Sequence, residues 1–229
     1  MRKAPSRRLP PIRQLLELMA GLRAPDGCPW DREQDHMSLR MHAVEEVYEL
    51  VDAIEAGDDV EMAEELGDLL LQVVFHAQLA TERGAFDFDR LTQVLVDKLV
   101  RRHPHVFGDV RVKDVDQVWA NWEAIKKAEK AGSKHERRSA LDGIPRHLPA
   151  LMRAQKLVKK ASKAALPVPG TVPEAKGKGA AAAALFDWVL ACQERGWNAE
   201  ELLRAETARR EKALRAAEKR ASAGKTPAK

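Results

Sequence analysis

The spacing of apolar residues is the feature that most restricts what this 229-residue chain can fold into. Between residues 12 and 22, Ile, Leu and Met recur at intervals of three and four, as they do on one face of an α-helix. Residues that favour strands are scarce, with four Ile, five Thr and a single Tyr against abundant Ala, Leu, Glu, Lys and Arg. The sequence therefore predicts an all-α fold.

Capping and helix-breaking residues divide this pattern into segments. Ser38 is placed to cap a helix, and Pro104 to stop one. Gly57-Asp58 is placed to end one helix and begin the next. The stretch 24–35, rich in Pro, Gly and Asp, is expected to be a loop. The predicted helices cover about 11–22, 38–56, 60–82, 89–102, 114–130, 148–164, 181–195 and 199–220.

Charge is distributed unequally along the chain. Residues 1–130 contain 18 Lys and Arg against 25 Asp and Glu, a net charge of −7, whereas residues 131–229 contain 21 against 10, a net charge of +11. The overall +4 therefore hides two parts of opposite sign. We expect a first domain at 1–130, a linker at 131–147, a second helical region at 148–220 with a flexible segment at 165–180, and a disordered tail at 221–229.

Several classes of protein are excluded by simple counts. The two cysteines, Cys28 and Cys192, give neither a disulfide framework nor a thiolate zinc site. No uncharged apolar run approaches the ~20 residues that a membrane span needs. The N-terminal stretch is basic but has no apolar core of the kind found in signal peptides. We therefore expect a cytoplasmic protein without a membrane partner.

Carboxylates gather on either side of the turn expected at Gly57-Asp58. Glu46 and Glu49 lie one helical turn apart before the turn, and Glu65 and Asp68 lie one turn apart after it. In an antiparallel hairpin rising ~1.5 Å per residue, the four reach the same heights in two opposed pairs. Four such carboxylates would repel one another unless cations lay among them, and hard oxygen ligands suit Mg²⁺ or Mn²⁺. The simpler alternative is a solvated, Glu-rich helix face.

Six blocks of sequence in the first two thirds of the chain form a recognisable series. They are GCPWD (27–31), EEVYEL (45–50), EELGDLLLQVVFHAQLA (64–80), ERGAFDFD (82–89), DKLVRRHPHVFGDV (97–110) and WEAIKKAEK (122–130). In this order they resemble the MazG family of nucleoside triphosphate pyrophosphohydrolases, and the resemblance covers about residues 10–165.

The resemblance implies a fold, a reaction and a set of metal ligands. It implies an all-α MazG-like bundle that forms homodimers and, with Mg²⁺, splits nucleoside triphosphates into the monophosphate and pyrophosphate. The implied metal ligands are Glu46, Glu49, Glu65 and Asp68. Glu45 would then either support these ligands or act as the general base. Glu49 is the other candidate for the base.

Cations and aromatic residues further along the chain are candidates for substrate contacts. Lys98 and Arg102 lie one turn apart beside Arg101, at a helix end where cations also offset the helix dipole. The resemblance implies that these cations contact phosphates, and that Trp122 lies near the nucleotide. Trp119 either shares that role or packs beneath it.

Other residues are given no catalytic role. His76 follows an apolar run and is interpreted as a packed helix residue. His103 and His105 flank a proline at a helix end, where they can form local hydrogen bonds. Trp30 and Asp31 belong to a loop that either covers the site or only closes the chain locally.

The C-terminal half resembles a second, degenerate copy of the same domain. When 184–218 is aligned with the first copy, the acidic pair falls at Ala180 and Ala183, and the preceding acidic helix is replaced by a Pro-, Gly- and Ala-rich stretch. Without carboxylates no metal cluster can form there. We expect this half to serve packing, dimerisation or partner binding.

Three functions remain open from the sequence. The first is a Mg²⁺-dependent pyrophosphohydrolase acting on nucleoside triphosphates in general. The second is a narrower enzyme acting on dUTP or a nucleotide-linked metabolite. The third is a non-enzymatic helical module whose basic half binds nucleic acid or a protein. The acidic hairpin favours an enzyme over a binding module. The resemblance implies the first of the two enzymes, with nucleoside triphosphates rather than nucleic acid as the expected partners.

Overall fold

The computed structural model describes residues 4–134, 136–168 and 177–223, and this part of the chain is helical or irregular, with no strand. This confirms the all-α prediction. The chain divides into two compact units, Met1–Val118 and Trp119–Lys229. The segment 165–180, expected to be flexible, lies partly outside the described residues, and so does most of the expected tail at 221–229.

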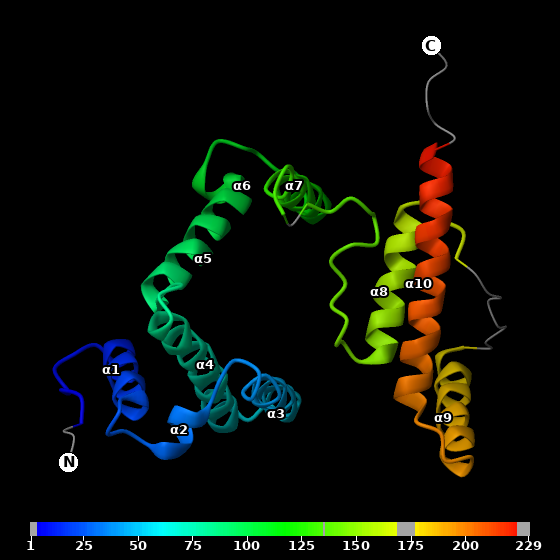
Figure 1. Cartoon of the computed structure of the whole chain (residues 1–229). Coiled ribbons are helices and arrows are strands. Elements are labelled where there is room, and N and C mark those ends of the chain that lie inside the picture. Colours follow the sequence, from blue (N-terminus) through cyan, green and yellow to red (C-terminus); the bar gives the residue numbers. More distant parts are fainter. Residues whose placement is uncertain (1–3, 135, 169–176, 224–229) are drawn as a thin grey trace. The chain divides into compact units, whose positions relative to one another are not determined.

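The first unit is built around a long helix with shorter helices packed on it (Figure 1). α3 and α4 form a hairpin, α1 packs on α4, and α5 follows α4. The bounds are α1 (Pro11–Arg23), α2 (Pro29–Glu33), α3 (His42–Ala56), α4 (Asp59–Glu82), α5 (Phe88–Arg102) and α6 (Pro104–Phe107).

The core of the first unit lies between α1 and the C-terminal half of α4. Its buried members are Met19, Leu39, Val74, Phe75 and Leu79. They come from both helices and from the turn that precedes α3, so burial of these side chains holds α4 in place. The N-terminal half of α4, which carries the acidic residues, lies outside this core.

Most helix ends agree with the sequence prediction, but the start of α3 does not. Ser38 was expected to cap this helix, which begins only at His42. The carboxylate of Asp35 instead accepts the backbone N–H groups of Met37 and Ser38, both at 2.7 Å, and so forms a turn ahead of the helix. The expected loop 24–35 also contains the short helix α2, which starts at Pro29.

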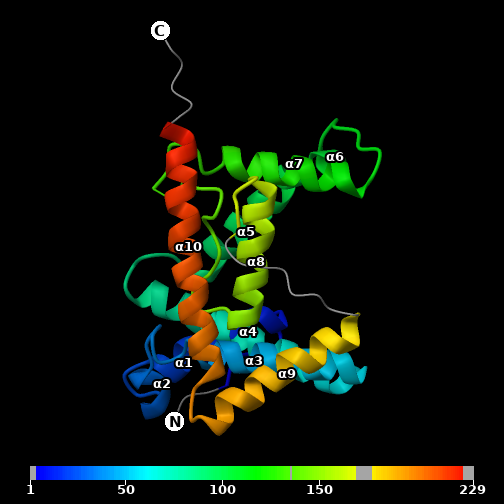
Figure 2. The ribbon, with the colours of Figure 1, turned by 90° about the vertical axis from the view of Figure 1, so that its right-hand side faces the viewer.

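The second unit contains two long helices that lie side by side and run in the same direction (Figure 1). These are α8 (Ala150–Lys163) and α10 (Ala199–Ala223); α9 (Lys178–Glu194) contacts α10 and leans away from its axis (Figure 2). α7 (Val115–Ala128) begins just before the division between the units. A small core of Leu141, Leu157, Ala161 and Leu214 joins α8 to α10.

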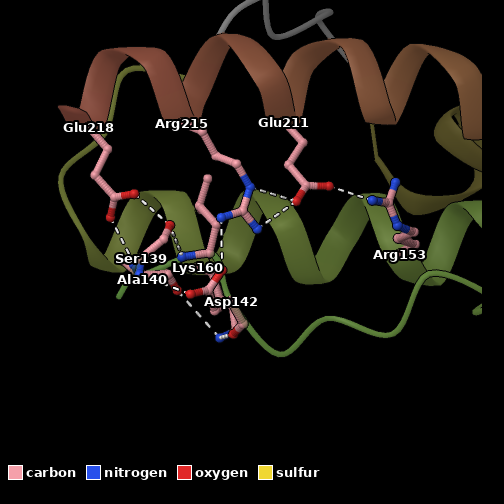
Figure 3. Close-up of polar contacts among 9 residues, drawn as sticks. Ser139, Ala140, Asp142, Arg153, Lys160, Glu211, Arg215 and Glu218 are labelled. Atoms are coloured by element: carbon pink, nitrogen blue, oxygen red, sulfur yellow. Dashed lines mark hydrogen bonds and ion pairs between the residues drawn. The ribbon is translucent and has the colours of Figure 1, made fainter. Parts of the chain in front are cut away.

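A row of polar contacts reinforces that apolar core (Figure 3). Glu211 of α10 pairs with Arg153 of α8, and its Oε1 also accepts Nη2 of Arg215 at 2.8 Å. Arg215 reaches on to Asp142, also at 2.8 Å. Glu218 accepts the backbone N–H of Ala140 at 2.8 Å, so the segment before α8 is bonded to α10 as well.

Candidate metal centre

A tight turn sets the register of the two helices that carry the acidic residues. Gly57 ends α3 with φ +68°, a left-handed conformation that glycine adopts without strain. The side chain of Asp58 then accepts the N–H groups of Val60 and Glu61, at 2.9 and 3.1 Å, and begins α4. Both features were predicted from the sequence. Because the turn is so short, α3 and α4 lie antiparallel and their acidic faces meet.

Three carboxylates from the two helices converge. One oxygen from each of Glu46, Glu49 and Glu65 lies within 4.8 Å of the other two, a separation that a single cation could bridge. Glu65 is buried, with 9% of its surface exposed, whereas Glu46 is half-buried and Glu49 is exposed. The Oε2 atom of Glu65 is buried without a hydrogen-bond partner among the described residues. A buried carboxylate oxygen in this state suits a cation.

The electrostatics of the cluster point in the same direction. Although Glu49 is exposed, partial desolvation of its carboxyl group raises its pKa, and the negative charges of Glu46 and Glu45 raise it further. The pKa of Glu65 is raised by burial and then by the charge of Glu49. Both carboxyl groups are therefore harder to ionise than in water, and a cation among them would favour the ionised forms and so offset both causes. The chemistry of this donor set fits a hard divalent ion.

Asp68 and Glu45 lie at the edge of the cluster. Asp68 is half-buried one turn beyond Glu65 on α4 and is not one of the three that converge, but its charge raises the pKa of both Glu49 and Glu65. The side chain of Glu45 is exposed and lies 3.6 Å from Nδ1 of His42. Their assignments as a metal ligand and as a base remain predictions.

Gln72 is a member of the site that the sequence analysis did not identify. Its side chain is 7% exposed, and its Nε2 donates to Oε1 of Glu46 at 3.3 Å. The hydrogen bond fixes one oxygen of Glu46 from a position on α4 deep in the hairpin. A signal was present in the sequence, because Gln72 is the one polar residue in the run LLLQVVF at 69–75. A polar residue in such a run needs a partner.

The proposed substrate-binding residues lie on other helices. Lys98, Arg101 and Arg102 occupy the last two turns of α5 in the first unit; Lys98 and Arg102 are half-buried and Arg101 is exposed. Trp122 and the exposed Trp119 lie in α7, within the second unit. Contact of any of these residues with a nucleotide remains a prediction.

The histidines lie in local contacts. His76 stacks on His36, with ring centroids 5.1 Å apart and the two Nδ1 atoms 2.8 Å apart. Burial lowers the pKa of His76, and the charge of His36 lowers it further. Nδ1 of His103 lies 2.6 Å from the carbonyl oxygen of Leu99 at the end of α5.

Comparison with known proteins identifies the family to which this helical hairpin belongs. Residues 34–107, which include the whole α3–α4 hairpin, match the model of the MazG nucleotide pyrophosphohydrolase domain. A nucleoside triphosphate pyrophosphohydrolase of Escherichia coli is 51% identical over 150 residues, which cover 65% of this chain and 56% of that protein. The chain belongs to the MazG family. The carboxylates that converge thus lie inside its MazG domain.

Two other relatives extend the comparison. The MazG pyrophosphohydrolase of Thermotoga maritima is 46% identical over 149 residues, covering 65% of this chain and 56% of that protein. An uncharacterised 26.1 kDa protein of Streptomyces cacaoi is 44% identical over 206 residues, 89% of this chain and 81% of that protein. The chain thus spans only about half the length of the MazG proteins named for an activity. No described helix is both long and apolar enough to cross a membrane.

Proposed function

We propose that this protein is a Mg²⁺-dependent nucleoside triphosphate pyrophosphohydrolase that converts a nucleoside triphosphate and water into the monophosphate and pyrophosphate. The observation that carries the proposal is the convergence of Glu46, Glu49 and Glu65 within 4.8 Å, on two helices of the MazG domain. A donor set made up entirely of oxygen atoms suits Mg²⁺, and Mn²⁺ can replace it. Both ions serve phosphate chemistry. The names of the E. coli and T. maritima relatives support the same reaction.

The residues of the hairpin have distinct roles in this proposal. Glu46, Glu49, Glu65 and Asp68 would hold the metal, with Gln72 orienting Glu46. When bound, Mg²⁺ supplies positive charge that lowers the pKa of a water and offsets charge on the phosphates.

Residues outside the ligand set would handle the proton and the substrate. Glu45, or Glu49 in its place, would accept the proton of the attacking water. Lys98, Arg101 and Arg102 would contact the triphosphate. Trp122 would stack on the base, a contact that tolerates different bases.

Release of pyrophosphate from the eight common nucleoside and deoxynucleoside triphosphates, with and without Mg²⁺, tests the reaction and the breadth of its substrates. The variants Glu46→Gln and Glu65→Gln should lose Mg²⁺-dependent release, whereas Glu55→Gln, which alters an exposed carboxylate of α3 outside the cluster, should retain it. Activity with dUTP alone would support the narrower enzyme. No release from any triphosphate would contradict the proposal and favour a binding module.

The metal can be tested without turnover. Mg²⁺ should raise the melting temperature of the wild type, because a ligand that binds only the folded state stabilises it. The shift should be smaller in Glu65→Gln and unchanged in Glu55→Gln. An equal shift in all three proteins would place the ion elsewhere.

We also propose that the protein acts as a homodimer in the cytoplasm. Apolar side chains of α3 that are 42–55% exposed support an interface between two copies. They are Val44, Val47, Val51 and Ile54. Light scattering after size exclusion would give the mass in solution, and a monomer at all concentrations would contradict the dimer.

A further inference from the structure

A second concave site lies in the basic half of the chain, far along the sequence from the carboxylates. It is a groove of about 730 Å³ lined mainly by residues of α10, together with Arg153 of α8 and the segment that precedes α8. Pockets for small ligands have volumes of about 300–1,000 Å³, so the groove is large enough for a small organic ligand. All of its lining belongs to the second unit.

The lining is strongly cationic. Against the single carboxylate of Glu211 it presents six cationic side chains: Arg146, Arg153, Arg204, Lys212, Arg215 and Lys219. The last four lie on α10 at spacings of eight, three and four residues, which place them along one face of the helix over ~22 Å. This face therefore gathers positive charge in one strip.

Half of these cations are already engaged by carboxylates of the protein. Arg153 pairs with Glu211, and Arg204 pairs with Glu200. Arg215 pairs with Glu211 and Asp142, as Figure 3 shows. These pairs fix the guanidinium groups in place, so part of the site is rigid before any ligand binds.

The other three cations of the groove have no carboxylate partner among the described residues. Among the described residues, none forms an ion pair with, or hydrogen-bonds to, the side chains of Arg146, Lys212 and Lys219, all of which are exposed. Nε of Arg153 is also buried without a hydrogen-bond acceptor, on a residue that is only 7% exposed. A buried guanidinium N–H that lacks an acceptor is costly. Three uncompensated cations beside such a donor are suited to an acceptor with several negative charges.

We propose that this groove binds a small polyphosphate anion, either free pyrophosphate or the 5′-polyphosphate of a nucleotide. Arginine matches phosphate oxygens with paired N–H donors, and lysine adds point charges that accommodate different phosphate positions. A groove of this volume suits a small ligand better than a duplex. The site uses no metal ligand, so binding should not require Mg²⁺.

The groove is tested by calorimetry on the full chain in EDTA, where the carboxylate cluster holds no metal. The probes are pyrophosphate, ATP, AMP and orthophosphate. The triple variant Arg146→Ala, Lys212→Ala and Lys219→Ala should bind pyrophosphate at least about tenfold more weakly than the wild type, because three phosphate contacts are lost. A matched triple variant on exposed α8 lysines, Lys156→Ala, Lys159→Ala and Lys163→Ala, changes the net charge equally and should bind as the wild type does.

The outcomes separate the possible sources of the anion. Tighter binding of ATP than of pyrophosphate would assign the groove to nucleotides, and the reverse order to free pyrophosphate; both support the proposal. Equal weakening in the two triple variants would overturn it, since attraction would then follow net charge alone. Absence of pyrophosphate and ATP binding in the wild type would overturn it as well. So would a single-stranded oligonucleotide that binds more tightly than either and displaces them.

Discussion

Arg23 at the end of α1 forms two parallel hydrogen bonds with Glu82 at the end of α4, Nε to Oε1 and Nη2 to Oε2, both at 2.7 Å. The guanidinium also donates to the carbonyl oxygen of Gln34 at 3.1 Å and lies 5.5 Å from the ring centroid of Phe75. One side chain thus joins the ends of two helices, the segment after α2 and the core.

Replacing Arg23 should therefore destabilise the first unit. Arg23→Lys keeps the charge but loses the paired geometry, and we expect it to lower the free energy of unfolding by about 2 kcal/mol, in the range of hydrogen bonds to charged groups. Urea denaturation followed by circular dichroism measures this. Arg13→Lys is the control, because Arg13 forms a single exposed contact with Asp89. Equal losses in both variants would contradict this role of Arg23.

The same pair predicts a dependence of stability on pH. The hydrogen bonds from Arg23 lower the pKa of Glu82 below its ordinary value of 4.5. Ionised Glu82 thus stabilises the folded state above that value, and the contribution is lost as the pH falls through the lowered pKa. The free energy of unfolding of the wild type should fall more steeply between about pH 5 and about pH 3 than that of Glu82→Gln. Parallel curves for the two proteins would show that the pair has no such effect.

The hydrogen bond from Gln72 to Glu46 predicts an effect on metal affinity. Gln72→Met keeps the length of the side chain and removes the donor, so Glu46 loses the contact that orients it. We expect Mg²⁺ affinity to fall by about tenfold, as for other residues that orient metal ligands. A Mg²⁺ titration followed by melting temperature measures it. Gln93→Met, on the exposed face of α5, should leave the affinity unchanged.

The parts of this site that the sequence predicts correctly depend on interactions between residues that are close in the chain. The turn at Gly57-Asp58 is local, and it gave the register of the hairpin and the meeting of Glu49 with Glu65. Gln72 contacts Glu46 across 26 positions, and nothing in the spacing of the acidic residues indicates that pairing. The same register places Asp68 opposite Glu46; Asp68 is not among the three carboxylates that converge, and its role as a ligand stays a prediction.

In the fold, too, features set by nearby residues were predictable and contacts between distant residues were not. Helix ends set by proline and glycine were predictable, as at Pro11 and Gly57. Ser38 failed as a cap because its hydroxyl is bonded back to Asp35, accepting the backbone N–H of Asp35 at 2.9 Å and donating to its carbonyl oxygen at 3.1 Å. The pairing of Arg23 with Glu82 joins residues 59 positions apart, and patterns within single helices carry no information about it.

In the second unit, the buried Arg153 predicts a contrast between two carboxylates of α10. Glu211→Gln should lower the free energy of unfolding by about 3 kcal/mol, because it leaves a buried guanidinium without its counter-charge. Glu206→Gln breaks exposed pairs with Arg209 and Arg210 and should cost less than about 1 kcal/mol. Chemical denaturation of both variants measures the difference, and comparable losses would show that burial of Arg153 does not determine it.

The short connection at Gly57-Asp58 has a consequence for how this protein can tolerate change in chain length. Each residue inserted there would shift the helices along one another by ~1.5 Å and turn one acidic face through ~100°. Glu49 would then no longer face Glu65, although both helices could still form. Insertions at the turn around Gly84 would leave that alignment intact, because both carboxylates precede it. Length variation compatible with metal binding is therefore expected at the second turn and not at the first.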